Sequence, residues 1–350
     1  MNDCGGLLQA HPSQLARWAK ANRVPLNVTF ELTPFCNFRC VMCYVRLEPE
    51  QAAAQGQLLE PAQWLEIAHQ ARKMGTLNLT LTGGEPLTHP HFWEIYEKLN
   101  KMGFLITVLS NGYLIDEVVM EKFRRFGMPY AMKLTLYGAS DETYLRTCGR
   151  ADGFTRVSAA IELLQQAKIP LQLSATIVRE NAADLQEMYR FARQRSLPFQ
   201  HTMTVSRSSR GAVNSVETSR FSYEEFLHEL TLEELEKSKF PPLESPFAWC
   251  LSYGCALWVT WNGRLQSCTF LTDPAVQWSG NLEKDWAELL SATDALKSPA
   301  ECAQCRWSPF CQRCPGLLCA ESGHPEKIDS GLCHTAKCLF HRYEQWRDES

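Results

Sequence analysis

Three cysteines stand close together near the start of the chain, at Cys36, Cys40 and Cys43. They follow an apolar, strand-like segment, so we expect them on the loop that leaves this strand. A [4Fe–4S] cluster usually takes four cysteines, and three ligands leave one iron open to bind another molecule. The same thiols are also compatible with a zinc site completed by a distant residue, or with no metal at all.

The chain has 15 cysteines among its 350 residues, and their distribution is uneven. Ten of them follow residue 249, at Cys250, Cys255, Cys268, Cys302, Cys305, Cys311, Cys314, Cys319, Cys333 and Cys338. Disulfide-based domains are small, secreted and rich in cysteine throughout. Here a long cysteine-poor stretch separates the two groups, and no secretory signal is visible at the N-terminus. We therefore expect metal ligation in a reducing cytoplasm rather than disulfides.

Composition and charge exclude several classes of function. Hydrophobic residues make up 45% and charged residues 21%, which is typical of a folded, soluble protein with one large domain and a smaller module. The balance of 35 Lys and Arg against 39 Asp and Glu gives a net charge of −4, which argues against a nucleic-acid partner. No apolar run approaches the ~18–20 residues that a membrane helix needs, so we expect no membrane span.

The middle of the chain alternates strand-like and helix-like patterns. Six short apolar segments are predicted as strands: Leu26–Leu32, Leu77–Thr82, Phe104–Leu109, Ala131–Tyr137, Leu171–Val178 and Phe199–Val205. Helices are predicted between them, at Trp64–Ala71, Phe92–Met102, Glu117–Phe126, Phe154–Ala167 and Ala183–Arg195. This alternation predicts an α/β fold with parallel strands and right-handed crossovers, in either an open or a closed sheet.

Three polar features follow the first three predicted strands. They are the cysteine group, the turn Gly83–Pro86 and the pair Ser110–Asn111. The carboxyl ends of parallel strands meet at one edge of a sheet, where ligands gather. We therefore expect these features to form one site. After the sixth strand, the Ser-, Arg- and Gly-rich stretch 205–218 is predicted as a solvated loop, followed by a helix over Tyr223–Lys239 and a linker, Phe240–Pro242.

The segment Thr33–Tyr44 resembles the signature of radical S-adenosylmethionine (SAM) enzymes, and Gly83–Pro86 resembles the methionine-binding turn of that family. The resemblance implies a partial (β/α)6 barrel and a [4Fe–4S] cluster on Cys36, Cys40 and Cys43. The open iron of this cluster chelates SAM in the family. One electron then cleaves SAM to methionine and a 5′-deoxyadenosyl radical, which takes hydrogen from the substrate.

The same resemblance implies a set of SAM-binding residues: Met42, Gly83, Gly84, Glu85, Pro86, Ser110, Asn111, Thr135 and Arg146. By the family pattern, Gly84 and Glu85 meet the methionyl amino group, and the backbone beside Met42 meets the adenine. Thr135 stands near the place of a ribose-contacting Ser. Arg146 stands near an Arg that pairs with the SAM carboxylate, a contact suited to its bidentate fork.

The C-terminal cysteines alone fit either a zinc ribbon or iron–sulfur ligation. Behind the radical SAM signature they resemble a SPASM domain, which carries two auxiliary [4Fe–4S] clusters. The resemblance assigns Cys250, Cys255, Cys268 and Cys314 to the first, and Cys302, Cys305, Cys311 and Cys333 to the second. Cys311 and Cys314 are separated by two residues where the family usually has three, so the first auxiliary cluster has either four cysteines or an open iron. Four cysteines are left without a role: Cys4, Cys148, Cys319 and Cys338.

These resemblances divide the chain into an N-terminal extension (1–25), a radical SAM core (26–240) and a cysteine-rich SPASM domain (241–350). They imply a cytoplasmic enzyme that modifies a ribosomally made peptide or protein by forming a thioether or carbon–carbon crosslink, with a flavodoxin or ferredoxin as electron donor. Only 35 residues precede Cys36, too few for the leader-binding domain that many such enzymes carry.

Two other functions remain open. A sulfatase-type maturase makes formylglycine, but that group has an Asp after the cysteine equivalent to Cys268, where this chain has Thr269. Losing that carboxylate removes a general base. A non-catalytic iron–sulfur carrier, or a zinc-stabilised binding module, has no need of the Gly83–Pro86 turn. No catalytic acid or base is assigned, and His89 and His91 are expected at a helix start or at the surface.

Overall fold

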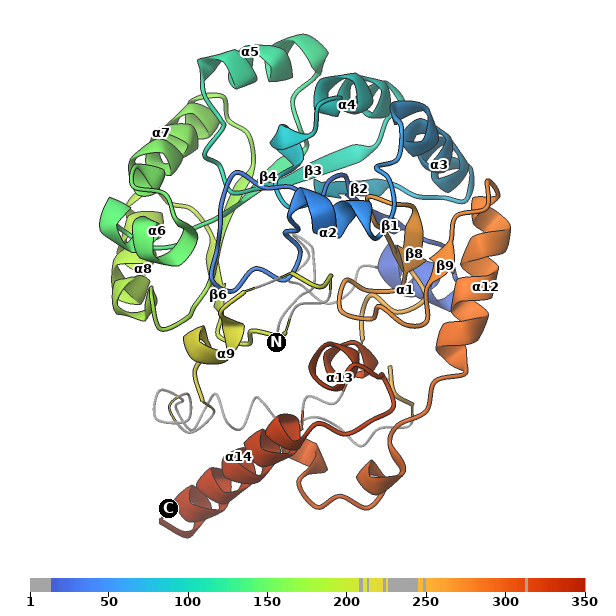
Figure 1. Cartoon of the computed structure of the whole chain (residues 1–350), viewed down its shortest axis with the longest axis vertical. Coiled ribbons are helices and arrows are strands. Elements are labelled where there is room, and N and C mark those ends of the chain that lie inside the picture. The colour runs from blue at the N-terminus through green and yellow to red at the C-terminus, as the bar shows by residue number, and fades with distance from the viewer. Residues whose placement is uncertain are drawn as a thin grey trace.

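A computed structural model describes residues 14–207, 210–212, 214–222, 225, 245–247, 250–311 and 314–349. The six predicted strands are present and parallel, and their order in the sheet follows the chain. They are β1 (Asn27–Glu31), β2 (Asn78–Thr82), β3 (Leu105–Ser110), β4 (Ala131–Thr135), β5 (Leu171–Thr176) and β6 (Phe199–Thr202). Helices arc around the outside of these strands in Figure 1, which confirms the partial barrel.

The sheet continues past β1 into the cysteine-rich region. β7 (Ala256–Val259) pairs parallel to β1, and β8 (Arg264–Gln266) and β9 (Val276–Gln277) follow in antiparallel pairing. In the described part of the chain the sheet therefore has nine strands and is open, ending at β6 and β9. The domain boundary at residue 241 stays a prediction, and one sheet extends across it.

The predicted helices between the strands are also present: α3 (Pro61–Lys73), α4 (Phe92–Lys101), α5 (Glu117–Phe126), α7 (Gly153–Gln166) and α8 (Leu185–Gln194). Two further helices between β1 and β6, α2 (Pro49–Ala53) and α6 (Asp141–Cys148), were not predicted. The Ser140 hydroxyl caps α6 by accepting from the Thr143 N–H, and Gly149 ends it in a left-handed conformation. These local signals identify a short helix that buries Tyr144 and Cys148 and leaves Leu145 exposed.

An apolar core lies between the sheet and the helices that cover it. Phe30 of β1 contacts Trp64 of α3, with 4.7 Å between their ring centroids, and both side chains are fully buried. α3 begins at Pro61 behind a capping box formed by Glu60 and Gln63. The cap fixes where the helix starts and so orients its apolar face toward β1. Burying aromatic side chains of this size makes a large contribution to the stability of the barrel.

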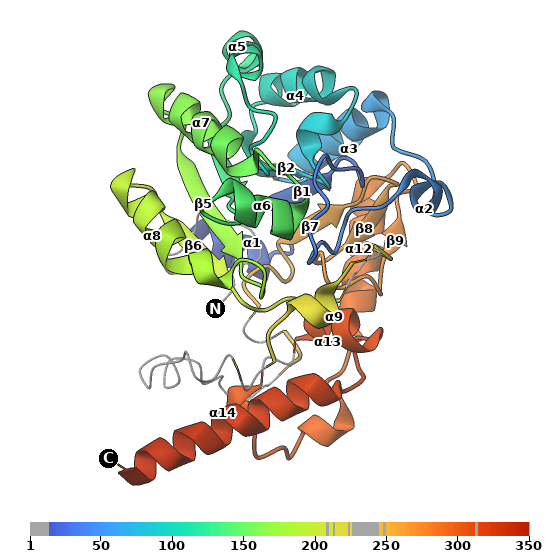
Figure 2. The same ribbon diagram turned by 60° about the vertical axis from the view of Figure 1, so that its left-hand side comes forward.

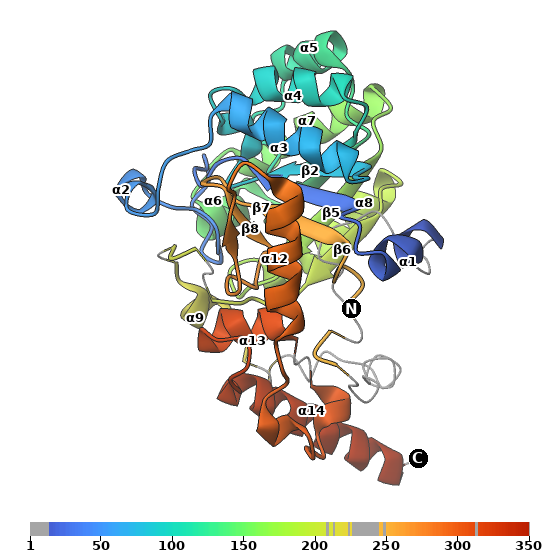
Figure 3. The ribbon, with the colours of Figure 1, turned by 90° about the vertical axis from the view of Figure 1, so that its right-hand side faces the viewer.

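The remaining elements surround the barrel and the C-terminal region. They are α1 (Gln14–Ala21), α2 (Pro49–Ala53), α9 (Val216–Ser219), α12 (Leu282–Asp294), α13 (Pro315–Ser322), α14 (Ser330–Glu349) and the short 3-10 helices η1 (Pro86–Thr88), η2 (Ala182–Asp184), η3 (Ala300–Cys302) and η4 (Ser308–Phe310). α12 runs beside the strands next to α3 (Figure 3). α13 lies between the barrel and α14 (Figure 2). No helix among the described residues is long and apolar enough to cross a membrane.

The prediction of a solvated loop over 205–218 is wrong for part of the described segment, although residues such as Arg207 and Gly211 are exposed as expected. Ser206 and Arg210 are both buried, and α9 begins within the segment. Arg210 is buried because its guanidinium pairs with the carboxylate of Glu31, at the end of β1. The helix predicted over Tyr223–Lys239, apart from Glu225, and the linker Phe240–Pro242 lie outside the described residues, as does Cys4.

Candidate active site

The first three cysteines lie on the loop between β1 and α2, as predicted. The backbone N–H of Phe38 donates to Cys36 Sγ over 3.3 Å, and that of Arg46 donates to Cys43 Sγ over 3.2 Å. Burial raises the pKa of the Cys43 thiol to about 11, with the neighbouring Cys40 as a second cause. A metal that binds here must therefore displace thiol protons, and the backbone donors then support the thiolates.

The Gly83–Pro86 turn is in direct contact with the cysteine loop. The Gly84 N–H donates to the Thr33 carbonyl over 2.7 Å, and the Glu85 N–H donates to the Phe35 carbonyl over 2.9 Å. A Cβ on Gly84 would lie 2.2 Å from the Phe35 carbonyl oxygen, and one on Gly83 would lie 2.5 Å from that of Thr33. Glycine is required at both positions because the two backbones approach so closely.

The Glu85 side chain joins this turn to the turn that follows β3. Its carboxylate accepts from the Ser110 hydroxyl at 2.9 Å, from the Asn111 N–H at 2.8 Å and from the Leu87 N–H at 3.2 Å. The side chain is fully buried, and burial raises its pKa to about 7. The three features that follow β1, β2 and β3 therefore meet at one edge of the sheet. Contact of Glu85 with a methionyl amino group stays a prediction.

Asn37 and Arg150, which were not predicted as site residues, also lie at this edge of the sheet. The Asn111 side chain donates to Asn37 Oδ1 over 2.7 Å and lies 3.7 Å from Cys36 Sγ. The guanidinium of Arg150, just after α6, donates from Nε to the Asn37 carbonyl over 2.7 Å. Asn37 lies inside the cysteine motif and was visible in the sequence. Arg150 carries no local signal, because its role depends on how α6 packs.

The other predicted SAM contacts are spread over β4, α6 and the cysteine loop. Met42 is buried among apolar side chains, and Thr135 ends β4. Arg146 lies on the exposed side of α6, where it pairs with Glu142 over 2.7 Å and donates to the Thr143 hydroxyl over 3.0 Å. The contacts of these three residues with SAM stay predictions.

Cys148 and the two histidines have separate surroundings. The Cys148 thiol is fully buried, donates to the Tyr144 carbonyl over 3.1 Å, and neighbours the Cys40 thiol. His91 directly precedes α4 as its N-cap residue, so it lies at a helix start as expected. His89 is buried instead of exposed, and burial lowers its pKa to about 4.

The cysteines assigned to the first auxiliary cluster come from distant parts of the C-terminal region. Burial raises the pKa of Cys250 to about 11 and that of Cys314 to about 12, and in both cases Cys268 is the next largest cause. Cys255 also has Cys250 as an electrostatic neighbour. Cys314 caps α13, its sulfur accepting from the Leu317 N–H over 3.2 Å. The structure thus places Cys314 beside Cys250 and Cys268.

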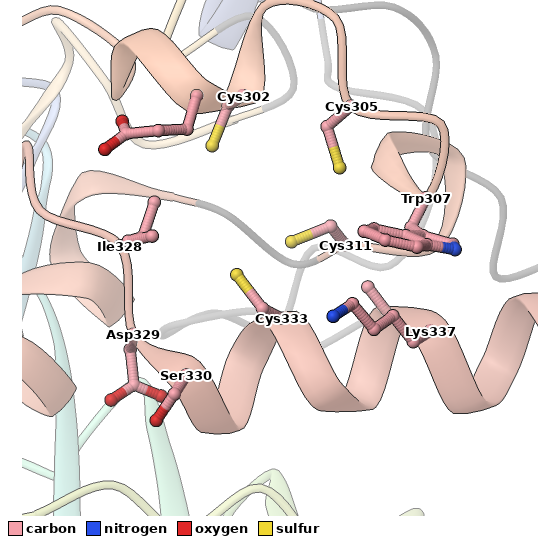
Figure 4. A pocket seen from close by; sticks show the side chains of 11 residues that line it. Cys302, Cys305, Trp307, Cys311, Ile328, Asp329, Ser330, Cys333 and Lys337 are labelled. Atoms are coloured by element: carbon pink, nitrogen blue, oxygen red, sulfur yellow. The ribbon is translucent and has the colours of Figure 1, made fainter.

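The cysteines assigned to the second auxiliary cluster line a cavity of about 610 Å³. Cys302, Cys305, Cys311 and Cys333 reach it from the η3–η4 segment and from α14, and their sulfurs are directed toward a common space in Figure 4. Trp307, Asp329 and Lys337 complete part of the lining, with Lys337 Nζ 4.5 Å from the Trp307 ring centroid. Two of the cysteines left without a role lie in this region. Cys319 is buried, and Cys338 lies on α14 with its Sγ 3.5 Å from Nε2 of His334.

The residues at the barrel edge fit a [4Fe–4S] cluster with SAM. Three cysteine thiols provide soft donors and leave one ligand position for another molecule. Asn37 Nδ2 is buried in the same loop and has no hydrogen-bond partner among the described residues, so it is a donor available to a bound group. Across the described residues, no three or more His, Cys, Asp or Glu side chains are arranged to hold a single metal ion.

Comparison with known proteins agrees with this geometry. Residues 30–192 match the family model of the Radical SAM superfamily. The AdoMet-dependent heme synthase of Methanosarcina barkeri is 28% identical over 204 residues, 58% of this chain and 57% of that protein. The PqqA peptide cyclase of Gluconobacter oxydans is 29% identical over 170 residues, 49% of this chain and 46% of that protein. The chain thus spans about half the length of these curated relatives.

A solved structure extends the likeness over nearly the whole fold. Streptococcus suis SuiB bound to its precursor peptide SuiA superimposes with a TM-score of 0.66 at 15% identity, covering 95% of this chain and 83% of that one. This likeness concerns the fold, whereas the match to the family model identifies residues 30–192 as a radical SAM domain. Radical SAM enzymes bind a [4Fe–4S] cluster and SAM.

Proposed function

We propose that this chain is a radical SAM peptide maturase that takes hydrogen from a ribosomally made peptide or protein and forms a thioether or carbon–carbon bond. The observation that carries the proposal is the direct joining of the three-cysteine loop to the Gly83–Pro86 turn at one edge of the sheet. A bound [4Fe–4S] cluster and SAM supply one-electron cleavage of SAM and the radical that abstracts hydrogen. Cys36, Cys40 and Cys43 hold the cluster, and a flavodoxin or ferredoxin supplies the electron.

Two comparisons support a peptide as the substrate class. One relative is named as a PqqA peptide cyclase, and the similar SuiB structure contains a precursor peptide. Two further groups of four cysteines, each gathered in the C-terminal region, support a pair of auxiliary clusters. The relative named as a heme synthase supports the SAM chemistry and leaves a tetrapyrrole as the competing substrate class.

The residue that follows Cys268 argues against formylglycine formation. Thr269 follows Cys268, is buried, and accepts through its carbonyl from Arg210. A threonine has no carboxylate to take a proton as a general base. We therefore place crosslink formation ahead of formylglycine formation.

The proposal is tested in two stages, each with its own readout. After anaerobic reconstitution, the protein is incubated with SAM and dithionite, and 5′-deoxyadenosine is measured by chromatography. Cys36→Ala is the control and should abolish the product. The protein is then co-expressed with short candidate precursor peptides, whose masses are measured. A reduced sample that never forms 5′-deoxyadenosine contradicts the enzyme, and peptides of unchanged mass contradict the peptide substrate.

A further inference from the structure

A buried ion pair lies behind the active-site edge and has no role in the proposed function. Arg210 Nη2 lies 3.0 Å from Glu31 Oε2, and Arg210 Nε lies 3.2 Å from Glu31 Oε1. Glu31 is the last residue of β1 and has 0% exposed side chain, while that of Arg210 is 5% exposed. Trp258 of β7 donates to the same carboxylate over 2.9 Å. Because both charges are out of water, each depends on the other.

The same guanidinium also reaches the loop of the first auxiliary site. Arg210 Nη1 donates to the Thr269 carbonyl over 3.1 Å, and Thr269 directly follows Cys268. One planar group therefore joins the end of a barrel strand to the backbone beside an auxiliary cysteine. Lysine has a single ammonium and lacks this rigid fork of donors.

The segment that carries Arg210 is bound to the first cysteine loop as well. The Asn214 side chain donates to the Cys43 carbonyl over 2.7 Å, and the Ser215 N–H donates to the Val41 carbonyl over 2.9 Å. The two cysteine loops also touch directly, since the Tyr44 and Phe270 rings lie 5.3 Å apart between centroids. Arg210 thus lies where the two cysteine loops meet.

We propose that Arg210 is a positioning residue that fixes the Cys268 loop against the barrel edge and, with Glu31, sets the reduction potential of the cluster bound there. The inference rests on the proposed function only in that it needs an auxiliary cluster at Cys268. Cluster potentials depend on nearby net charge and on outer contacts of the ligands. The intact pair is neutral, so losing either member leaves one uncompensated buried charge, of opposite sign in the two cases.

The test is an anaerobic redox titration of the reconstituted enzyme, followed by EPR without SAM or peptide. Arg210→Met leaves the negative charge of Glu31 and should lower the potential of the Cys268 cluster. Glu31→Gln leaves the positive charge of Arg210 and should raise it. Arg210→Lys keeps the charge but loses the planar fork of guanidinium donors, so it should alter the EPR line shape with a smaller shift in potential.

Arg190→Met is the matched control, because Arg190 is exposed on α8 and pairs there with Glu187. It should leave every readout unchanged.

The proposal is overturned if Arg210→Met and Glu31→Gln, with iron retained, shift the potential in the same direction or not at all. It is also overturned if Arg210→Lys has the wild-type EPR spectrum, or if Cys268→Ala removes no iron from the protein. Where Arg210→Met fails to fold, Glu31→Gln and Arg210→Lys decide the question. Failure of the proposed function can be told apart from failure of this inference, because the wild-type protein would then form no 5′-deoxyadenosine or leave the peptide unmodified.

Discussion

The backbone N–H of Asn111 donates to the carboxylate of Glu85 over 2.8 Å, and this contact joins the turns that follow β3 and β2. The backbone N–H of Glu85 in turn donates to the Phe35 carbonyl, next to the first cysteine. Three segments distant in sequence are thereby held in one hydrogen-bonded unit. Groups fixed in this way need little rearrangement when a ligand binds, which is the condition for precise orientation.

Replacing Gly84 by Ala should disrupt this unit. The new Cβ would lie 2.2 Å from the Phe35 carbonyl oxygen, so one of the two backbones has to move. We expect a loss of about 1–3 kcal/mol in the free energy of unfolding, typical of overpacking, and at least a roughly tenfold loss of SAM cleavage. Denaturant titration and 5′-deoxyadenosine formation measure the two effects.

Gly280→Ala is the control for this substitution. Its Cβ meets nothing within 4 Å, but Gly280 has a φ of +99°. We expect only the backbone strain of about 1–2 kcal/mol and wild-type SAM cleavage. Equal losses of SAM cleavage in the two variants would show that the contact with Phe35 has no special role.

Glu85 should make the stability of the metal-free protein depend on pH. Its pKa is raised by burial from 4.5 to about 7, so the folded state holds the proton more tightly than the unfolded state. The free energy of unfolding should therefore fall as the pH rises from 5 to 7 and level off above 7. The full effect is roughly 3 kcal/mol for a shift of this size. Glu85→Gln cannot ionise and should remove this slope in denaturant titrations at pH 5, 6, 7 and 8. If the free energy of unfolding changes with pH in the same way in the wild type and in Glu85→Gln, this prediction is contradicted.

Cys305→Ala should remove one auxiliary cluster and leave SAM cleavage in place. Cys305 is one of four cysteines around the 610 Å³ cavity, which is lined by residues between Glu301 and Lys337 and by none of the barrel-edge residues. We expect about four fewer iron atoms per chain, measured by colorimetric iron assay, since losing one of its four thiolate ligands should leave this [4Fe–4S] cluster too weakly held to stay bound. Cys338→Ala, on the same helix as Cys333, should keep the full iron content. Zinc in place of iron in the wild-type protein would contradict the auxiliary cluster.

Cys148→Ala should leave the iron content unchanged. The thiol is fully buried and donates to the Tyr144 carbonyl, so its loss should cost about 1–2 kcal/mol in the free energy of unfolding. Iron assay and denaturant titration separate the two effects. If iron is lost from a protein that still folds, Cys148 supports the first cluster through its neighbour Cys40.

The strands and helices of the barrel were predictable because their signals are local. Apolar runs closed by turn residues located β1 to β6 to within a few residues, and the helix predicted over Trp64–Ala71 lies inside α3. The segments predicted over Leu171–Val178 and Phe199–Val205 are shorter as strands, because the chain leaves the sheet before its apolar residues end. α6 was missed because it is short and its signals are its two caps rather than a long apolar pattern.

By itself, the sequence shows which residues could carry the chemistry: three cysteines in a short loop, a Gly-Gly-Glu-Pro turn after the next strand, and ten further cysteines after residue 249. Only the tertiary structure decided how these parts meet. Arg210 stands in a polar stretch typical of a solvated loop, yet it is buried because its partner Glu31 lies 179 residues away. Likewise, β7 extends the barrel sheet, and Cys314 lies beside Cys250 and Cys268. Periodicity and spacing report only near neighbours, whereas burial of a charge or a thiol depends on contacts between distant segments.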